Sequence, residues 1–274
     1  MSHHPDEEGL RIEHDDAVLR ITIDRQHVRN AVTDPGLGLM ADAVATAAGD
    51  GATRVIVLAG AGEHFCAGID LPSVNPSPKH GGTNERPRTG HVQRGLAARA
   101  HRLVRALWES QLPVVAVVRG HASGVGCNLA LASDFVVASR TARFAEAFVR
   151  RGLTPDSGGS FLLPRLVGVA RAKEMLLLGE ALTAEEAHQW GLVTRLADDA
   201  ALEDEAERLI GRLATSATVA VGLTKSLVHR SLESTLSQAL EHEGVVEELA
   251  VRSGDFKEGL AAFVEKRDPD FRGR

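Results

Sequence analysis

The first sixty residues alternate between apolar and polar positions, change to a helical period and end in an apolar run. Residues 10–14 and 18–23 alternate as the two strands of a hairpin, with a turn at Asp15 and Asp16. A helix is expected over residues 35–48, with Asp34 as its cap and Pro35 at its first position. The β-branched run RVIVLAG that follows predicts a buried strand.

The middle of the chain repeats the order of strand, glycine turn and helix. A helix is expected from about Thr89 to Leu107, and LPVVAVVRG at 112–120 predicts a second buried strand. A short helix over 124–133 precedes a third strand, DFVVAS. Residues 71–90 are dense in Pro, Gly, Ser and Asn and lack an apolar period, which is typical of a loop. This order favours repeated ββα units.

From residue 183 onward the apolar spacing is almost purely helical. The expected helices lie near residues 183–190, 199–214, 218–230, 234–251 and 255–266. We therefore place a soft boundary near residue 200. It divides a ββα core, residues 1–200, from a C-terminal helical region, residues 201–274, that could pack on the core or on another subunit.

The composition indicates which partners the protein could bind and in which cellular compartment it is expected. The 274 residues are 43% hydrophobic and 25% charged, which is typical of a folded globular protein, and the net charge of −6 disfavours nucleic acid as a partner. Cys66 and Cys127 form neither a disulfide framework nor a metal-binding spacing, so we expect a reducing compartment and no metal. The sequence has no 18-residue apolar run and no signal peptide, which favours a cytoplasmic protein that does not bind membranes.

Three short motifs carry candidate chemistry: HFCAGIDL at 64–71, HASGVGCNL at 121–129 and LTPDSGGSF at 153–161. The first two match neither a phosphate loop nor a dinucleotide fingerprint. Close packing explains each turn alone, whereas two such turns facing each other could hold an oxygen that gains negative charge. In the third motif, DSGG is like a serine-protease nucleophile loop, which the helical chain disfavours. Asp156 could also cap a helix that begins near Gly158.

Together with LGEALTAEEAHQWGLVTRL and GLAAFVEKRDPDF, these motifs resemble the enoyl-CoA hydratase/isomerase (crotonase) superfamily over residues 10–272. The resemblance implies an α/β fold, in which a spiral of ββα units precedes helices that form a homotrimer, or a hexamer of two trimers. It also implies an acyl-CoA thioester as substrate. No separate cofactor is expected, because CoA is part of that substrate.

The resemblance also assigns residues. The thioester oxygen would lie between the backbone N–H groups of Ile69 and Val125. Contacts with CoA are implied for Arg25, His27 and Val28, for Cys66, Ala67, Gly68, Asp70 and Leu71, and, across a subunit boundary, for Phe263 and Lys266.

Hydratases of this superfamily use two glutamates, and the matching positions here are Asn128 and Phe148. Neither side chain can transfer a proton at neutral pH, so both are assigned to the acyl pocket. Glu146 is expected at the surface or at a packing edge. Asp156 matches the single acid of isomerase-type members, which implies an enoyl-CoA isomerase. A hydratase that uses another acid such as Glu146, and a silent acyl-CoA-binding protein, stay as alternatives.

Overall fold

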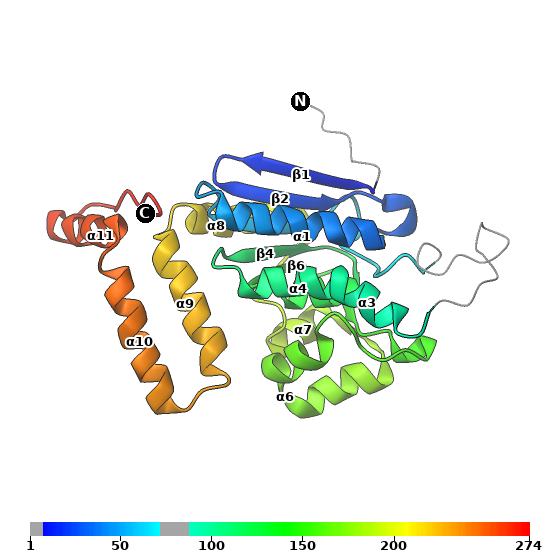
Figure 1. The fold of residues 1–274 in the computed structure, drawn as a ribbon. Helices are drawn as coiled ribbons and strands as arrows, with labels where there is room; N and C mark the ends of the chain where they lie inside the picture. The colour runs from blue at the N-terminus through cyan, green and yellow to red at the C-terminus, as the bar shows by residue number, and fades with distance from the viewer. Residues whose placement is uncertain (1–7, 72–87) are drawn as a thin grey trace.

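A computed structural model of the chain describes residues 8–71 and 88–274, and its centre is a six-stranded sheet (Figure 1). The order in this sheet is β1 (Leu10–Asp15), β2 (Val18–Ile23), β3 (Val55–Gly60), β4 (Val114–Val118), β6 (Phe135–Ser139) and β9 (Arg195–Ala197). β1 and β2 form the predicted antiparallel hairpin, and the other neighbours are parallel. A second sheet contains β5 (His121–Ser123), β7 (Arg143–Ala145) and β8 (Ala181–Thr183).

The central strands are buried on both faces, as their continuous apolar sequences predict. Ile56 and Leu58 join the main core, while Val55 and Val57 point to the opposite face, because successive side chains of a strand alternate. Helix α8 (Leu202–Ala214) covers that second face. Helices α1 (Asp34–Gly49) and α4 (Ala100–Glu109) pack side by side along the main core (Figure 1).

The three predicted buried strands are confirmed, but two helix details are wrong. The helix expected from Thr89 is divided into α3 (His91–Ala98) and α4, because Arg99 between them has a non-helical backbone, with φ −129° and ψ −83°. The cap of α1 is Thr33 rather than Asp34: the Thr33 hydroxyl accepts a hydrogen bond from the N–H of Gly36 at 3.0 Å. Asp34 instead pairs with Arg99 at 2.7 Å.

The helical character of the C-terminal third is confirmed. The other helices of the described residues are α5 (Val125–Leu131), α6 (Gly159–Leu178), α7 (Ala184–Trp190), α9 (Thr218–Ser231), α10 (Leu236–Ala250) and α11 (Gly254–Glu265), with short 3-10 turns η1 (Gln26–Val28), η3 (Val149–Arg151) and η4 (Asp199–Ala201). Helices α9 to α11 stand away from the sheet (Figure 1). The division near residue 200 stays a prediction, and α8, beyond it, packs on the sheet.

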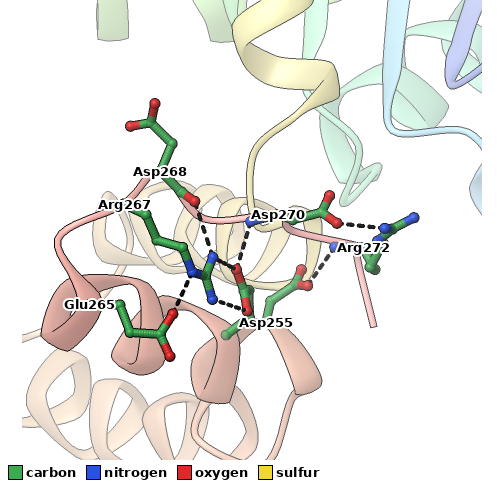
Figure 2. A network of polar contacts seen from close by, with 7 residues as sticks. Asp255, Glu265, Arg267, Asp268, Asp270 and Arg272 are labelled. Carbon is green, nitrogen blue, oxygen red and sulfur yellow. Dashed lines mark hydrogen bonds and ion pairs between the residues drawn. The ribbon is translucent and has the colours of Figure 1, made fainter.

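Polar contacts fold the C-terminal tail back onto α11 (Figure 2). The carboxylate of Asp255 accepts hydrogen bonds from the backbone N–H groups of Arg272 at 2.7 Å and Gly273 at 2.8 Å. Arg267 pairs with Glu258 at 2.6 Å. These contacts fix the path of the chain just after the end of α11.

Two further predictions concern loops and membranes. The predicted loop over residues 71–90 falls largely on residues 72–87, which lie outside the described residues. Within the described parts of the chain, none of the helices combines the length and the apolar run needed to cross a bilayer.

Candidate active site

The two glycine-containing turns lie in direct contact. The backbone N–H of Cys66 donates to the carbonyl of His121 at 2.8 Å, and the N–H of Ser123 donates back to the carbonyl of Cys66 at 2.9 Å. A Cβ on Gly126 would stand 2.3 Å from the Cys66 carbonyl oxygen, so only glycine fits there without a shift of the backbone. The turns are therefore held edge to edge by main-chain contacts, with small residues between them.

Each turn contains one of the two backbone N–H groups that are predicted to bind the thioester oxygen. Within residues 8–71 and 88–274, no acceptor pairs with the N–H of Ile69 or of Val125. The turn of Ile69 is fixed on both sides, because Val32 donates its N–H to Gly68 and Asp70 donates to Val32. Val125 is the first residue of α5, where the helix dipole adds partial positive charge. The two groups are suitable donors for an oxyanion.

Asp156 is tied to the second turn through α5. The Nδ2 of Asn128 donates to the backbone carbonyl of Asp156 at 2.9 Å. Asn128 follows Val125 by three residues, so both lie on one side of α5. The backbone of Ser157 has a φ of 53°. Its hydroxyl donates to Oδ1 of Asp156 at 2.6 Å. These contacts place the Asp156 loop beside the turn that carries the free N–H of Val125.

The environment of Asp156 suits a base better than a helix cap. Burial raises the pKa of its carboxyl, against the hydrogen bond from Ser157 and the nearby His101 of α4, which lower it. The N-cap of α6 is Gly158, and no side chain caps that helix. The capping role considered for Asp156 is therefore wrong, and its partly exposed carboxyl is bound only by the neighbouring hydroxyl among the described residues.

The expected surface position of Glu146 is wrong. Its side chain is completely buried, and burial raises its pKa to about 8. The thiol of Cys127 and the amide of Asn128 lower the pKa of Glu146, whereas the charge of Asp156 raises it. Glu146 follows Phe144 by two residues, so it points inward with that buried ring rather than outward.

The two residues assigned to the acyl pocket have little exposed surface. Asn128 is completely buried, and its amide is committed to the Asp156 carbonyl. The ring of Phe148 is almost buried and packs over Gly124, at 3.5 Å from the position of a Cβ on that glycine. Phe148 therefore covers the turn that precedes Val125, and a contact of either side chain with an acyl group stays a prediction.

Residues predicted to bind CoA gather at the first turn, but two of them bind each other. The guanidinium of Arg25 donates to Oδ2 of Asp70 at 2.9 Å and to the carbonyl of Ala31 at 2.6 Å. His27 is exposed and Val28 partly exposed in η1. Cys66 and Gly68 are buried, Ala67 is partly buried and Leu71 is exposed, so the outer part of the turn is the accessible one.

Phe263 and Lys266 lie elsewhere. Both are exposed, Phe263 at 83%, and α11 lies at the opposite end of the molecule from α3 (Figure 1). One chain does not bring them to the two turns. A role for them in binding CoA therefore requires a second subunit, as the resemblance implies.

Sequence reasoning missed one residue that shapes the first turn. Asn30 is completely buried with a φ of 59°, and its Nδ2 donates to the carbonyl of Ala61 at 2.9 Å and also to that of His64. Its Oδ1 accepts from the N–H of Arg25 at 2.9 Å. Only the tolerance of Asn for positive φ hinted at this role.

A comparison with protein families shows which family the chain belongs to. The sequence model described as enoyl-CoA hydratase/isomerase matches residues 13–274. The chain belongs to this family. It is accordingly an enzyme of the crotonase superfamily, and the predicted α/β fold of ββα units with C-terminal helices is confirmed by the solved relatives.

Individual relatives differ in their named reactions. The chain is 40% identical over 258 residues to 1,2-epoxyphenylacetyl-CoA isomerase of Escherichia coli (strain K12), covering 94% of this chain and 95% of the relative. It is 34% identical over 272 residues to carnitinyl-CoA dehydratase of Salmonella agona, covering 97% and 99%. The crystal structure of enoyl-CoA hydratase from Bacillus anthracis superposes with a TM-score of 0.88 at 30% identity, covering 97% and 100%. The family thus includes isomerase, dehydratase and hydratase activities.

Proposed function

We propose that this enzyme is an acyl-CoA isomerase that moves a proton with Asp156 while the N–H groups of Ile69 and Val125 stabilise an enolate oxygen. The observation that carries the proposal is the partly buried carboxyl of Asp156, on a loop whose backbone carbonyl accepts from Asn128 beside the first turn of α5. Removal of one oxyanion donor typically costs about 100- to 1,000-fold in rate, and a positioned base contributes about 100- to 10,000-fold. Both parts are therefore needed for turnover.

The reaction uses Asp156 twice. The carboxylate removes a proton adjacent or vinylogous to the thioester carbonyl, and the resulting negative charge collects on the thioester oxygen between the two N–H groups. The carboxyl of Asp156 is partly exposed, so its proton exchanges with water, and the same carboxyl then delivers a proton to another carbon. The raised pKa of Asp156 favours this transfer of a proton between carbons. A carboxyl whose pKa is closer to the pH of the medium both binds and releases a proton more readily.

A hydratase reaction has less support. The positions of the two hydratase glutamates are occupied by Asn128 and Phe148, and Glu146 is buried without contact with solvent. Asp70, in the first turn, pairs with Arg25, whereas the Asp156 loop is bound to α5 beside the turn of Val125. The similarity to 1,2-epoxyphenylacetyl-CoA isomerase also supports an isomerase, since that relative is named for this class of reaction.

The test compares wild type with Asp156→Asn on a 3-enoyl-CoA in ²H₂O. We expect solvent deuterium in the shifted alkene of the wild type and at least about a 100-fold lower rate in Asp156→Asn. Asp204→Asn, at an exposed position of α8, is the matched control and should retain the wild-type rate. Near-wild-type turnover by Asp156→Asn would overturn the assignment.

A second experiment separates the alternative activities. In H₂¹⁸O, label in a 3-hydroxyacyl product would indicate hydration, whereas a shifted double bond without label would support isomerisation. Binding of acyl-CoA with no deuterium in any acyl C–H position, across short, long and aromatic acyl groups, would indicate a silent binding protein.

A further inference from the structure

Glu146 and Asn128 both contain buried side-chain oxygens without a hydrogen-bond partner among the described residues. In the part of the chain that the structure describes, four buried side-chain nitrogen or oxygen atoms have no hydrogen-bond partner, and three of them belong to these two side chains. They are both carboxyl oxygens of Glu146 and Oδ1 of Asn128. The fourth, Nε of Arg11, faces the carboxylate of Asp24 at 3.3 Å. A buried polar atom without a partner is costly, so this pair needs an explanation.

Two of these atoms, Oδ1 of Asn128 and Oε2 of Glu146, border the same small space at the start of α6. A Cβ on Gly159 would stand 3.0 Å from Oδ1 of Asn128 and 3.3 Å from Oε2 of Glu146. The amide of Asn128 cannot simply be turned over, because its Nδ2 donates to the Asp156 carbonyl and Oδ1 would repel that carbonyl. Two acceptors therefore border one space, and neither has a hydrogen-bond donor among the described residues.

The surroundings disfavour a negative charge on Glu146. From α5, the neutral thiol of Cys127 and the amide of Asn128 lower the pKa of the carboxyl, but the effect of burial is larger. From the loop before α6, Asp156 adds a like charge. The first N–H of α6, from Gly159, donates to the Asp156 carbonyl and is not available to Glu146. Burial and this like charge thus both favour the protonated carboxyl, with a pKa of about 8.

We propose that Glu146 is protonated in the working enzyme and donates its O–H to Oδ1 of Asn128, so that Glu146 is a positioning residue for Asp156. A single proton then gives partners to the unpartnered Oδ1 and to the Glu146 oxygen that carries the proton. The path of hydrogen bonds runs from Glu146 to Asn128 and from Asn128 to the backbone of Asp156. This inference rests on the proposed role of Asp156 as the base.

Loss of the proton from Glu146 would change the position of Asp156 through Asn128, without a direct hydrogen bond between the two acids. An ionised Glu146 would repel Oδ1 of Asn128 and favour a turned amide, which gives up the hydrogen bond to the Asp156 carbonyl. The Asp156 loop would then lose its contact with α5 and with the turn of Val125. We therefore expect kcat to change more than KM, because the substrate contacts themselves stay in place.

The test compares Glu146→Gln, which keeps an N–H donor, with Glu146→Met, which fills the space without one. For isomerisation at pH 7 we expect Glu146→Met to lose at least about 10-fold in kcat with little change in KM, as for other residues that orient an active-site group. Glu146→Gln should recover most of that loss. In the wild type, kcat should fall as pH rises past about 8, and Glu146→Gln should lack this decline.

A readout that does not depend on turnover separates this inference from the proposed function. The infrared difference spectrum of wild type minus Glu146→Gln at pH 6 should contain the C=O stretch of a protonated carboxyl, and this band should titrate away in alkali. Absence of the band, or a Glu146→Gln variant that is as slow as Glu146→Met, would overturn the inference. If the band is present while Asp156→Asn retains full activity, Glu146 is protonated as inferred but the proposed base is wrong, so its positioning role falls with it.

Discussion

At the scale of single residues, the burial of Glu146 makes the stability of the fold depend on pH. Its pKa in the folded chain is about 8, against 4.5 in the unfolded chain. Between these values the unfolded chain releases a proton that the folded chain keeps, so the free energy of unfolding falls as pH rises. This contribution is complete below pH 4.5 and lost above about pH 8.

Glu146→Gln should therefore stabilise the protein at alkaline pH relative to wild type. We expect a gain that grows to about 5 kcal/mol between pH 4.5 and pH 8, because each unit of pKa shift corresponds to about 1.4 kcal/mol. Urea unfolding of both proteins across this range measures it. A difference in stability that is constant with pH would mean that Glu146 does not titrate as described.

The two acids differ in how far the sequence could predict them. Asp156 was proposed because its motif resembles that of isomerase-type members of the family, and its role stays a prediction. The predicted position of Glu146 was wrong, because only the distance of this residue from Phe148 along the chain was considered and not the direction in which its side chain points. Phe144, two residues earlier, is apolar, and a period of two would have placed Glu146 on the same inward side. Its partner Asn128 comes from a separate helix, and no local pattern brings the two together.

At the scale of elements, the contact between the two turns depends on Gly126. A methyl group there would meet the backbone of Cys66 at 2.3 Å, and a backbone carbonyl cannot rotate away as a flexible side chain could. Gly126→Ala should push the turn of Ile69 away from α5 and misalign the two N–H donors. We expect at least about a 100-fold loss of kcat, the typical effect of losing one such donor, measured in the deuterium assay.

Gly211→Ala is the matched control for this substitution. Gly211 also lies in a helix, but a Cβ there would meet nothing within 4 Å. Alanine favours a helix over glycine by roughly 0.5 to 1 kcal/mol, so this variant should be slightly more stable and fully active. Wild-type activity in Gly126→Ala would show that the edge-to-edge contact of the turns does not align the donors.

Element prediction from the sequence succeeded where the pattern itself carries the cause. The runs that became β3, β4 and β6 are β-branched and apolar because both faces of those strands are covered. The break at Arg99 could not be read, because the apolar spacing of Leu96, Ala100 and Leu103 continues across it. The short strands of the second sheet have three residues each, too few for an alternation to be recognised.

At the scale of the whole molecule, the C-terminal helices expose apolar surface that one chain does not cover. In α10 only Val246 is buried, while Leu236, Leu240 and Leu249 are exposed. Phe263 and Val264 are exposed at the end of α11. Surface of this kind in a well-packed chain marks an interaction site. We expect a homotrimer, or a hexamer of two trimers, in solution, and light scattering after size exclusion measures the mass. A monomer at micromolar concentration would contradict this.

If the site is shared between neighbours, two inactive variants should complement each other. Asp156→Asn removes the proposed base, and Lys266→Ala removes a residue that is predicted to contact CoA held by the next subunit. When the two are unfolded and refolded together, a site that combines Asp156 from one chain with Lys266 from its neighbour forms in about a quarter of cases in a ring of head-to-tail contacts. Activity should therefore rise toward about a quarter of the wild-type value, while each variant refolded alone stays low. No rise in the mixture, in oligomers shown to contain both chains, would mean that Lys266 acts on its own subunit or not at all.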